Sequence, residues 1–158
     1  MIVACDLSIH DISRVELDQV SGLPRFNMAL ELGADLGLRL EGPARQRRRK
    51  TLILDAEAHR YDQTLSDISG MDIESHGNEV RLIIRRVRDW LNDNREPGAD
   101  VFPGATAIND DYESYRKIAP GIVTRLRLDP HDELSHTDYL HVVRAALSRI
   151  AAARGIGG

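Results

Sequence analysis

The chain lacks the features that mark disulfide-stabilised and membrane-spanning proteins. It has one cysteine, Cys5, which excludes an internal disulfide. No apolar run approaches the roughly 20 residues of a membrane-spanning helix, and no basic segment opens a signal peptide. We therefore expect a cytoplasmic protein that does not associate with membranes, in which Cys5 is a small buried side chain.

Aromatic residues are also scarce, at 4% of the sequence, so aliphatic side chains and alanine have to supply most of a core. Hydrophobic residues make up 42% of the 158 residues, which is enough for one ordinary domain. The net charge of −4 argues against a dedicated nucleic-acid-binding protein, which would normally be basic. The composition thus predicts a single globular domain over residues 1–158.

Hydrophobic patterning predicts two strands in the first third of the chain. Residues 7–12 alternate apolar and polar side chains, as in a strand with one buried face. Residues 51–54 form a continuous apolar run ending at Asp55, which is typical of a buried strand in a parallel sheet. The basic run Arg45–Lys50 before it is interpreted as a solvated loop, because the chain is acidic overall.

A helix is expected between these strands, over residues 24–40, with Pro24 in its first turn. Glycine costs helix propensity, so we expect Gly33 and Gly37 to let one face lie close against a sheet. The apolar positions that define this face are Phe26, Ala29, Leu30, Gly33, Leu36, Gly37 and Leu40.

The rest of the chain is mostly helical in pattern. Residues 56–77 are expected to be irregular, with a short helix near 61–68. We expect Trp90 in the core, a further helical turn after Pro120, and Ser135 or Thr137 as the cap of the last helix. The expected helices cover residues 78–94, 106–118 and 137–153.

Strands that alternate with helices imply an α/β fold with a parallel sheet and right-handed crossovers. We divide the expected domain into residues 1–77, which hold the strand–helix–strand unit and a site loop, and a helical part, residues 78–154. This helical part offers an interface through which the protein would form a homo-oligomer.

A site is expected where the strands end, because ligands in open α/β sheets bind beyond the carboxyl ends of the strands. Asp11 and Ser13 end the first strand, and Asp55 ends the second. Asn27 and Glu31 are four residues apart on one face of the following helix. A plain solvated helix face and a turn capped by Asp11 would give the same pattern, so both interpretations stay open.

These residue types suit a nucleotide or a nucleoside. A helix N-terminus favours a phosphate, Asp11 suits ribose hydroxyls, and Glu31 suits attack on, or stabilisation of, a sugar C1′. Asp72 and His76 lie in a polar, glycine-rich segment that either lines the same pocket, with His76 as an acid or base, or forms a surface loop. The histidines show no metal-binding spacing, so no metal site is expected.

The segment Asp11-Ile-Ser13, followed by residues 24–33, resembles the superfamily of nucleoside 2-deoxyribosyltransferases and TIR-type NAD-hydrolysing domains. Those proteins carry Asp-x-Ser/Thr at a strand end and then a helix that opens near an Asn and continues into Glu-Leu-Gly. In that superfamily the Glu is the catalytic carboxylate at the ribosyl C1′. The resemblance assigns this role to Glu31, with Asp11 and Asn27 as contacts to the sugar.

Residues 25–33 and 66–73 are also similar to a family of uncharacterised bacterial TIR-like proteins. The resemblance implies a flavodoxin-like, TIR-like parallel sheet that needs no cofactor and takes NAD or a nucleotide as substrate. In such folds at least one βα unit precedes the Asp-x-Ser strand, and each βαβ unit takes about 30 residues or more. Here the Asp-x-Ser strand begins close to Met1, so we expect a fold that is incomplete at its N-terminus.

Three functions follow as alternatives. The first is an enzyme that cleaves an N-glycosidic bond in NAD or a nucleoside through Glu31. The second is a non-catalytic nucleotide-sensing or interaction module in bacterial signalling or defence. The third is a plain partner-binding α/β domain.

Overall fold

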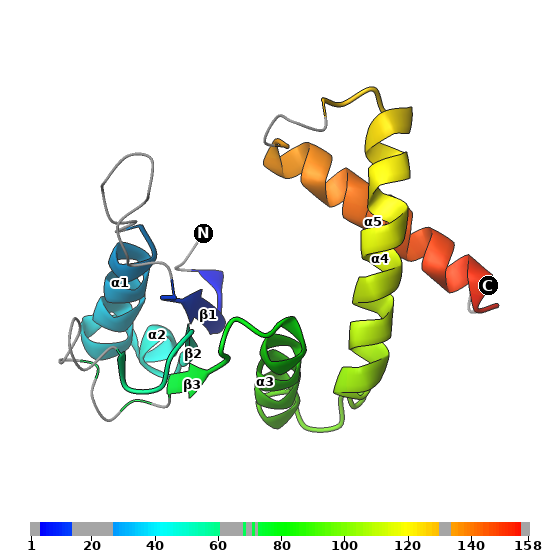
Figure 1. Cartoon of the computed structure of the whole chain (residues 1–158). Coiled ribbons are helices and arrows are strands. Elements are labelled where there is room, and N and C mark those ends of the chain that lie inside the picture. The colour runs from blue at the N-terminus through cyan, green and yellow to red at the C-terminus, as the bar shows by residue number, and fades with distance from the viewer. Residues whose placement is uncertain are drawn as a thin grey trace. The chain divides into compact units, whose positions relative to one another are not determined.

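The computed structural model describes residues 4–13, 27–60, 68, 71, 73–129 and 134–155. The chain forms two compact units, Met1–Phe102 and Pro103–Gly158, called here the first and the second unit. Figure 1 shows the strands within the first unit and a pair of helices in the second. This division falls after the helix α3 (Val80–Asp93).

The first unit contains a three-stranded parallel sheet in the order β1-β2-β3, so the α/β class is confirmed. Its strands are β1 (Leu7–Asp11), β2 (Lys50–Asp55) and β3 (Ile73–Ser75). Both pairings are parallel, with Ile9 opposite Leu52 and Ile53 opposite Ile73. The strand β3 was not expected, because three residues are too few to show an alternation.

The helix α1 (Asn27–Glu41) lies beside β1 (Figure 1) and buries Leu32 and Asp35. Leu32 packs with three isoleucines to form the core of the first unit: Ile12, Ile53 and Ile68. This cluster is largely aliphatic, as the scarcity of aromatic residues predicts.

The face that α1 turns to the sheet differs from the expected one. Leu30 and Leu40 are each 72% exposed, and apart from the backbone of α1 itself no atom of the described residues lies within 4 Å of a Cβ built on Gly33 or Gly37. The prediction that these glycines allow close contact with a sheet is therefore wrong. Burial of Asp35 explains the difference, because this side chain binds partners on the sheet and so fixes the rotation of the helix.

The basic run after α1 is helical in part, and four of its five basic residues are exposed as expected, namely Arg45, Arg47, Arg48 and Lys50. Residues Ala44–Arg47 form a short helix, α2, and Arg49 is only 3% exposed. A Cβ on Gly42 would collide with the Leu38 carbonyl oxygen, so the turn into α2 requires glycine. Cys5 was expected to be buried and is exposed; its carbonyl oxygen accepts a hydrogen bond from Arg49 Nε at 3.1 Å.

The helix α3 (Val80–Asp93) completes the first unit and agrees with the prediction for residues 78–94. None of its residues is fully buried, and Trp90 is half-buried and not a core residue. Arg88 donates a hydrogen bond to the Phe102 carbonyl oxygen at 2.9 Å, which fastens the following segment to the helix.

The second unit pairs α4 (Ala105–Arg125) with α5 (His136–Ala153). The helix α4 passes without interruption through Pro120, so the expected helix over residues 106–118 and the helical turn expected after Pro120 form one continuous helix. The N-cap prediction is confirmed for Ser135, whose Oγ accepts a hydrogen bond from the Asp138 backbone N–H at 3.1 Å. The buried seam between the helices is made by Ile122, Val142 and Ala146.

Within the part of the chain that the structure describes, no helix is both long enough and apolar enough to cross a membrane. The short helix expected near residues 61–68 lies, apart from Ile68, outside the described residues.

Candidate functional site

A cavity of about 640 Å³ opens where β1 and β3 end. Its described lining comes from the segments after these strands and from the first turns of α1 and α3. The lining residues are Asp11, Ser13, Asn27, Met28, His76, Asn78 and Ile83. The carboxyl edge of the sheet therefore holds a cavity, and three of the expected substrate-binding residues line it together with His76.

Three of these side chains form a hydrogen-bonded relay. Asp11 Oδ1 accepts a bond from the Ser13 backbone N–H at 2.9 Å and a short one from the Ser13 hydroxyl. Ser13 Oγ lies 2.8 Å from His76 Nε2. His76 is fully buried, whereas the Asp11 side chain is 44% exposed. The relay thus runs from a buried imidazole to a carboxylate at the rim of the cavity.

The backbone fixes the direction of this relay. The Asn78 backbone N–H donates to His76 Nδ1 at 3.1 Å, so the neutral ring carries its hydrogen on Nε2. His76 then donates to Ser13 Oγ, and the Ser13 hydroxyl donates to Asp11. Ser13 is not prepared as a nucleophile, because its neighbouring histidine is a donor and not a base.

Asp11 is the polar group of the relay that remains available to a ligand. Its Oδ1 receives both bonds from Ser13, and among the described residues nothing hydrogen-bonds to Oδ2. A carboxylate oxygen of this kind is a strong acceptor for ligand hydroxyls. The arrangement favours binding of a hydroxyl-bearing molecule.

Asp55 does not join the cavity, contrary to expectation. It is buried and accepts a hydrogen bond from Arg60 Nη2 at 2.5 Å. The same Arg60 nitrogen donates to the carbonyl oxygens of Ile12 and Ser13, at 3.1 and 2.7 Å. Asp55 therefore has a positioning role, since through Arg60 it holds the turn that carries Ser13.

Glu31 does not share the cavity with Asp11, Ser13 and Asn27. It is exposed and is not among the described lining residues. It lies one turn after Asn27 on the same helix face, so it is about 6 Å further along the helix axis. Asp72 lies outside the described residues.

A buried polar cluster, which the sequence analysis did not find, lies between α1 and the sheet. Asp35 accepts hydrogen bonds from Arg49 at 2.5 Å and from Ser8 and Thr51 at 2.7 Å each. His10 Nε2 is 3.6 Å from the same carboxylate. Burial raises the pKa of Asp35, but the bonds from Ser8 and Thr51 and the charge of Arg49 outweigh it, so the pKa is lowered overall.

This cluster fixes the rotation of α1 and, with it, the position of Asn27 at the cavity. Asp35 lies four residues after Glu31, at the spacing of the solvated helix face that the sequence leaves open as an alternative. The signal that could have revealed it was the arginine directly before β2, since a buried arginine needs a buried carboxylate.

The chemistry of the site is that of polar side chains. Among the described residues, no group of three histidine, cysteine or acidic side chains is arranged to hold a metal ion. Comparisons with protein-family models, with curated proteins and with solved structures find no match for this chain.

Proposed function

We propose that the protein binds a nucleoside or nucleotide in the cavity at the carboxyl edge of the sheet, with Asp11 accepting hydrogen bonds from the ribose hydroxyls. The observation that supports this most directly is the Asp11 carboxylate. One of its oxygens is held by Ser13, and the other meets no described residue at the cavity rim.

The cavity and its surroundings suit this class of ligand. Its volume of about 640 Å³ falls in the range of small-molecule sites, roughly 300–1,000 Å³. Asn27 offers an amide that both donates and accepts. The first turn of α1 borders the cavity, and a helix N-terminus favours a phosphate group.

The resemblance of residues 11–13 and 24–33 to nucleotide-directed TIR-like proteins supports the same ligand class and adds NAD to it. Cleavage of an N-glycosidic bond by Glu31 is the catalytic alternative. It is favoured by the position of Glu31 one turn after Asn27 on the same helix face. The exposure of Glu31 favours binding without catalysis, as in a nucleotide-sensing module.

Calorimetric titration of the full chain with adenosine, AMP and NAD tests the binding proposal. We expect at least one of these ligands to bind. Asp11→Asn should weaken that binding about tenfold, because a charge-assisted hydrogen bond is lost. Asp110→Asn is the matched control, since Asp110 is exposed on α4, and it should bind as the wild type does. Equal affinities in Asp11→Asn and the wild type would overturn the proposal.

Chromatographic analysis of NAD and nucleosides incubated with the protein tests the catalytic alternative. Release of the free base that disappears in Glu31→Gln would establish Glu31 as the catalytic carboxylate. Binding with no release of base would leave the sensing function, and release that persists in Glu31→Gln would remove this residue from the mechanism.

A further inference from the structure

A second cavity, of about 470 Å³, lies at the other end of β2. It is bordered by the start of β2, the later turns of α1 and the last turn of α3. The described lining residues are Arg39, Arg49, Lys50, Thr51, Met71, Trp90, Asp93 and Asn94. Since β2 has six residues, about 17 Å separates its two ends. This cavity is therefore a separate site from the one that contains Asp11.

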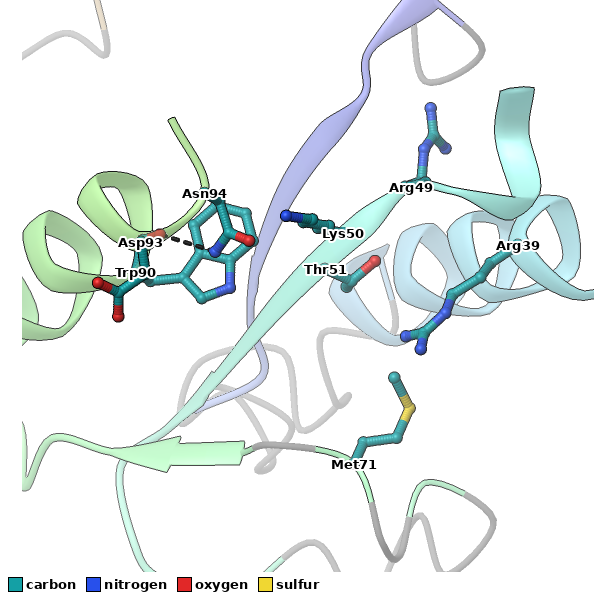
Figure 2. A pocket seen from close by; sticks show the side chains of 8 residues that line it. All are labelled: Arg39, Arg49, Lys50, Thr51, Met71, Trp90, Asp93 and Asn94. Atoms are coloured by element: carbon teal, nitrogen blue, oxygen red, sulfur yellow. Dashed lines mark hydrogen bonds between the residues drawn. The ribbon is translucent and has the colours of Figure 1, made fainter. Parts of the chain in front are cut away.

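Two of the three cationic side chains of this cavity have no partner among the described residues. Arg39 and Lys50 are exposed, and neither side chain has a hydrogen bond or ion pair with another described residue. Arg49 differs, because its guanidinium is held by Asp35. In Figure 2 the Lys50 side chain extends toward Trp90 and Asn94, and the Arg39 side chain extends toward Met71, with Thr51 between the two, whereas Arg49 points away. Arg39 and Lys50 thus contribute two positive charges to the lining of one cavity.

The cations are accompanied by a flat aromatic ring. Trp90 is half-buried, and its indole ring borders the cavity (Figure 2). Indole stacks well on other aromatic rings. Asn94 is tied to the same helix end through a bond to the Trp90 carbonyl oxygen at 2.7 Å, which leaves its own amide oxygen to a ligand.

The lining also contains one carboxylate, Asp93, which is exposed. Arg39 and Lys50 contribute two positive charges and Asp93 one negative charge, while the charge of Arg49 is paired with Asp35. The cavity therefore keeps one excess positive charge. This balance suits a small anion that reaches the two cations and leaves a neutral part near Asp93, and it is unfavourable to a polyanion.

We propose that this cavity binds a small phosphate ester that carries an aromatic ring. The Arg39 guanidinium and the Lys50 ammonium hold the phosphate oxygens, and the ring stacks on Trp90. The proposal does not depend on nucleotide binding at Asp11, since the two cavities share no lining residue.

The chain contains a single tryptophan, so intrinsic fluorescence reports on this cavity directly. Phenyl phosphate, inorganic phosphate and phenol serve as probes, and calorimetry provides a second measurement. We expect saturable binding of phenyl phosphate with a change in Trp90 emission, at least about tenfold weaker binding of inorganic phosphate, and none of phenol. A lack of saturable binding of phenyl phosphate in both measurements overturns the proposal.

Variants then locate the binding. Arg39→Gln and Lys50→Gln should each weaken phenyl phosphate binding about tenfold, because each removes a charge-assisted contact. The matched control is Arg47→Gln, an exposed residue of α2 outside the cavity, which should leave the affinity unchanged. An equal loss in Arg47→Gln, or a loss of phenyl phosphate binding in Asp11→Asn, would contradict the assignment to this cavity.

Discussion

The interior of each of the two units is stabilised by a different kind of contact. In the first unit, a buried carboxylate and a buried guanidinium, Asp35 and Arg49, lie beside the aliphatic core between α1 and the sheet. In the second unit, α4 and α5 meet in an apolar seam of Ile122, Val142 and Ala146. Oriented polar bonds define one rotation of a helix, whereas aliphatic packing tolerates several.

This difference matters for the candidate site. Asn27 reaches the cavity because α1 is fixed by bonds from Asp35 to Ser8, Thr51 and Arg49. We infer that the polar interior of the first unit positions the site. The same interior makes the stability of this unit sensitive to acid and to removal of the Asp35 charge. The second unit should lack this sensitivity.

Asp35→Asn should have the largest effect. It removes the buried negative charge that pairs with the Arg49 guanidinium, and the free energy of unfolding of the first unit should fall by about 3–5 kcal/mol. Amide hydrogen exchange resolves the two units, so protection of β2 should drop while that of α4 and α5 is kept. Unchanged protection of β2 would show that the buried pair does not stabilise this unit.

Ile122→Ala tests the second unit in the same way. Ile122 is almost fully buried, and truncation to alanine should cost about 3 kcal/mol through lost apolar contacts and a cavity. Protection should fall in α4 and α5 and not in β2. Leu147→Ala, at a half-exposed position of α5, is the control and should cost less than about 1 kcal/mol. If both substitutions cost the same, the seam is not the core of this unit.

Acid should destabilise the first unit more than the second. Because the pKa of Asp35 is lower in the folded chain than its ordinary value of 3.8, this group stabilises the first unit above that value. The stabilisation is lost as the pH falls below 3.8 through the folded pKa. Hydrogen exchange at pH 7 and near pH 3 should show a loss of protection in β2 that exceeds the loss in α5. A uniform loss, or the same pH dependence in Asp35→Asn, would contradict this account.

Ser135→Ala should have the smallest effect. The Ser135 hydroxyl accepts the Asp138 backbone N–H at the start of α5, and loss of an N-cap costs about 1 kcal/mol. Hydrogen exchange should increase in the first turn of α5 and leave the first unit unaffected. Thr137→Ala, at the second residue of α5, is the control, and an equal effect there would rule out capping as the cause.

Most of the elements were predictable from the sequence, because their periodicity extends over whole turns or strands. This holds for β1, β2, α1, α3 and α5. The strand β3 is too short for such a signal, and the helix expected to end at residue 118 continues through Pro120 because the residues on both sides pack on α5 through Ile118 and Ile122.

The candidate site was predictable in part. Asp11, Ser13, Asn27 and His76 meet at one cavity because parallel strands end at the same edge of the sheet. Asp55 was expected to bind substrate, and Asp35 was not identified as a buried residue, because the sequence does not reveal that each carboxylate is paired with an arginine. Those partners, Arg60 and Arg49, are set by tertiary contacts that periodicity does not encode.

The most direct measurement of the central claim uses the wild-type chain and two ligands that differ only in the ribose. If Asp11 accepts the ribose hydroxyls, adenosine should bind at least about tenfold more tightly than 2′,3′-dideoxyadenosine in calorimetric titration. Equal affinities of the two nucleosides, or no binding of adenosine, would contradict the account.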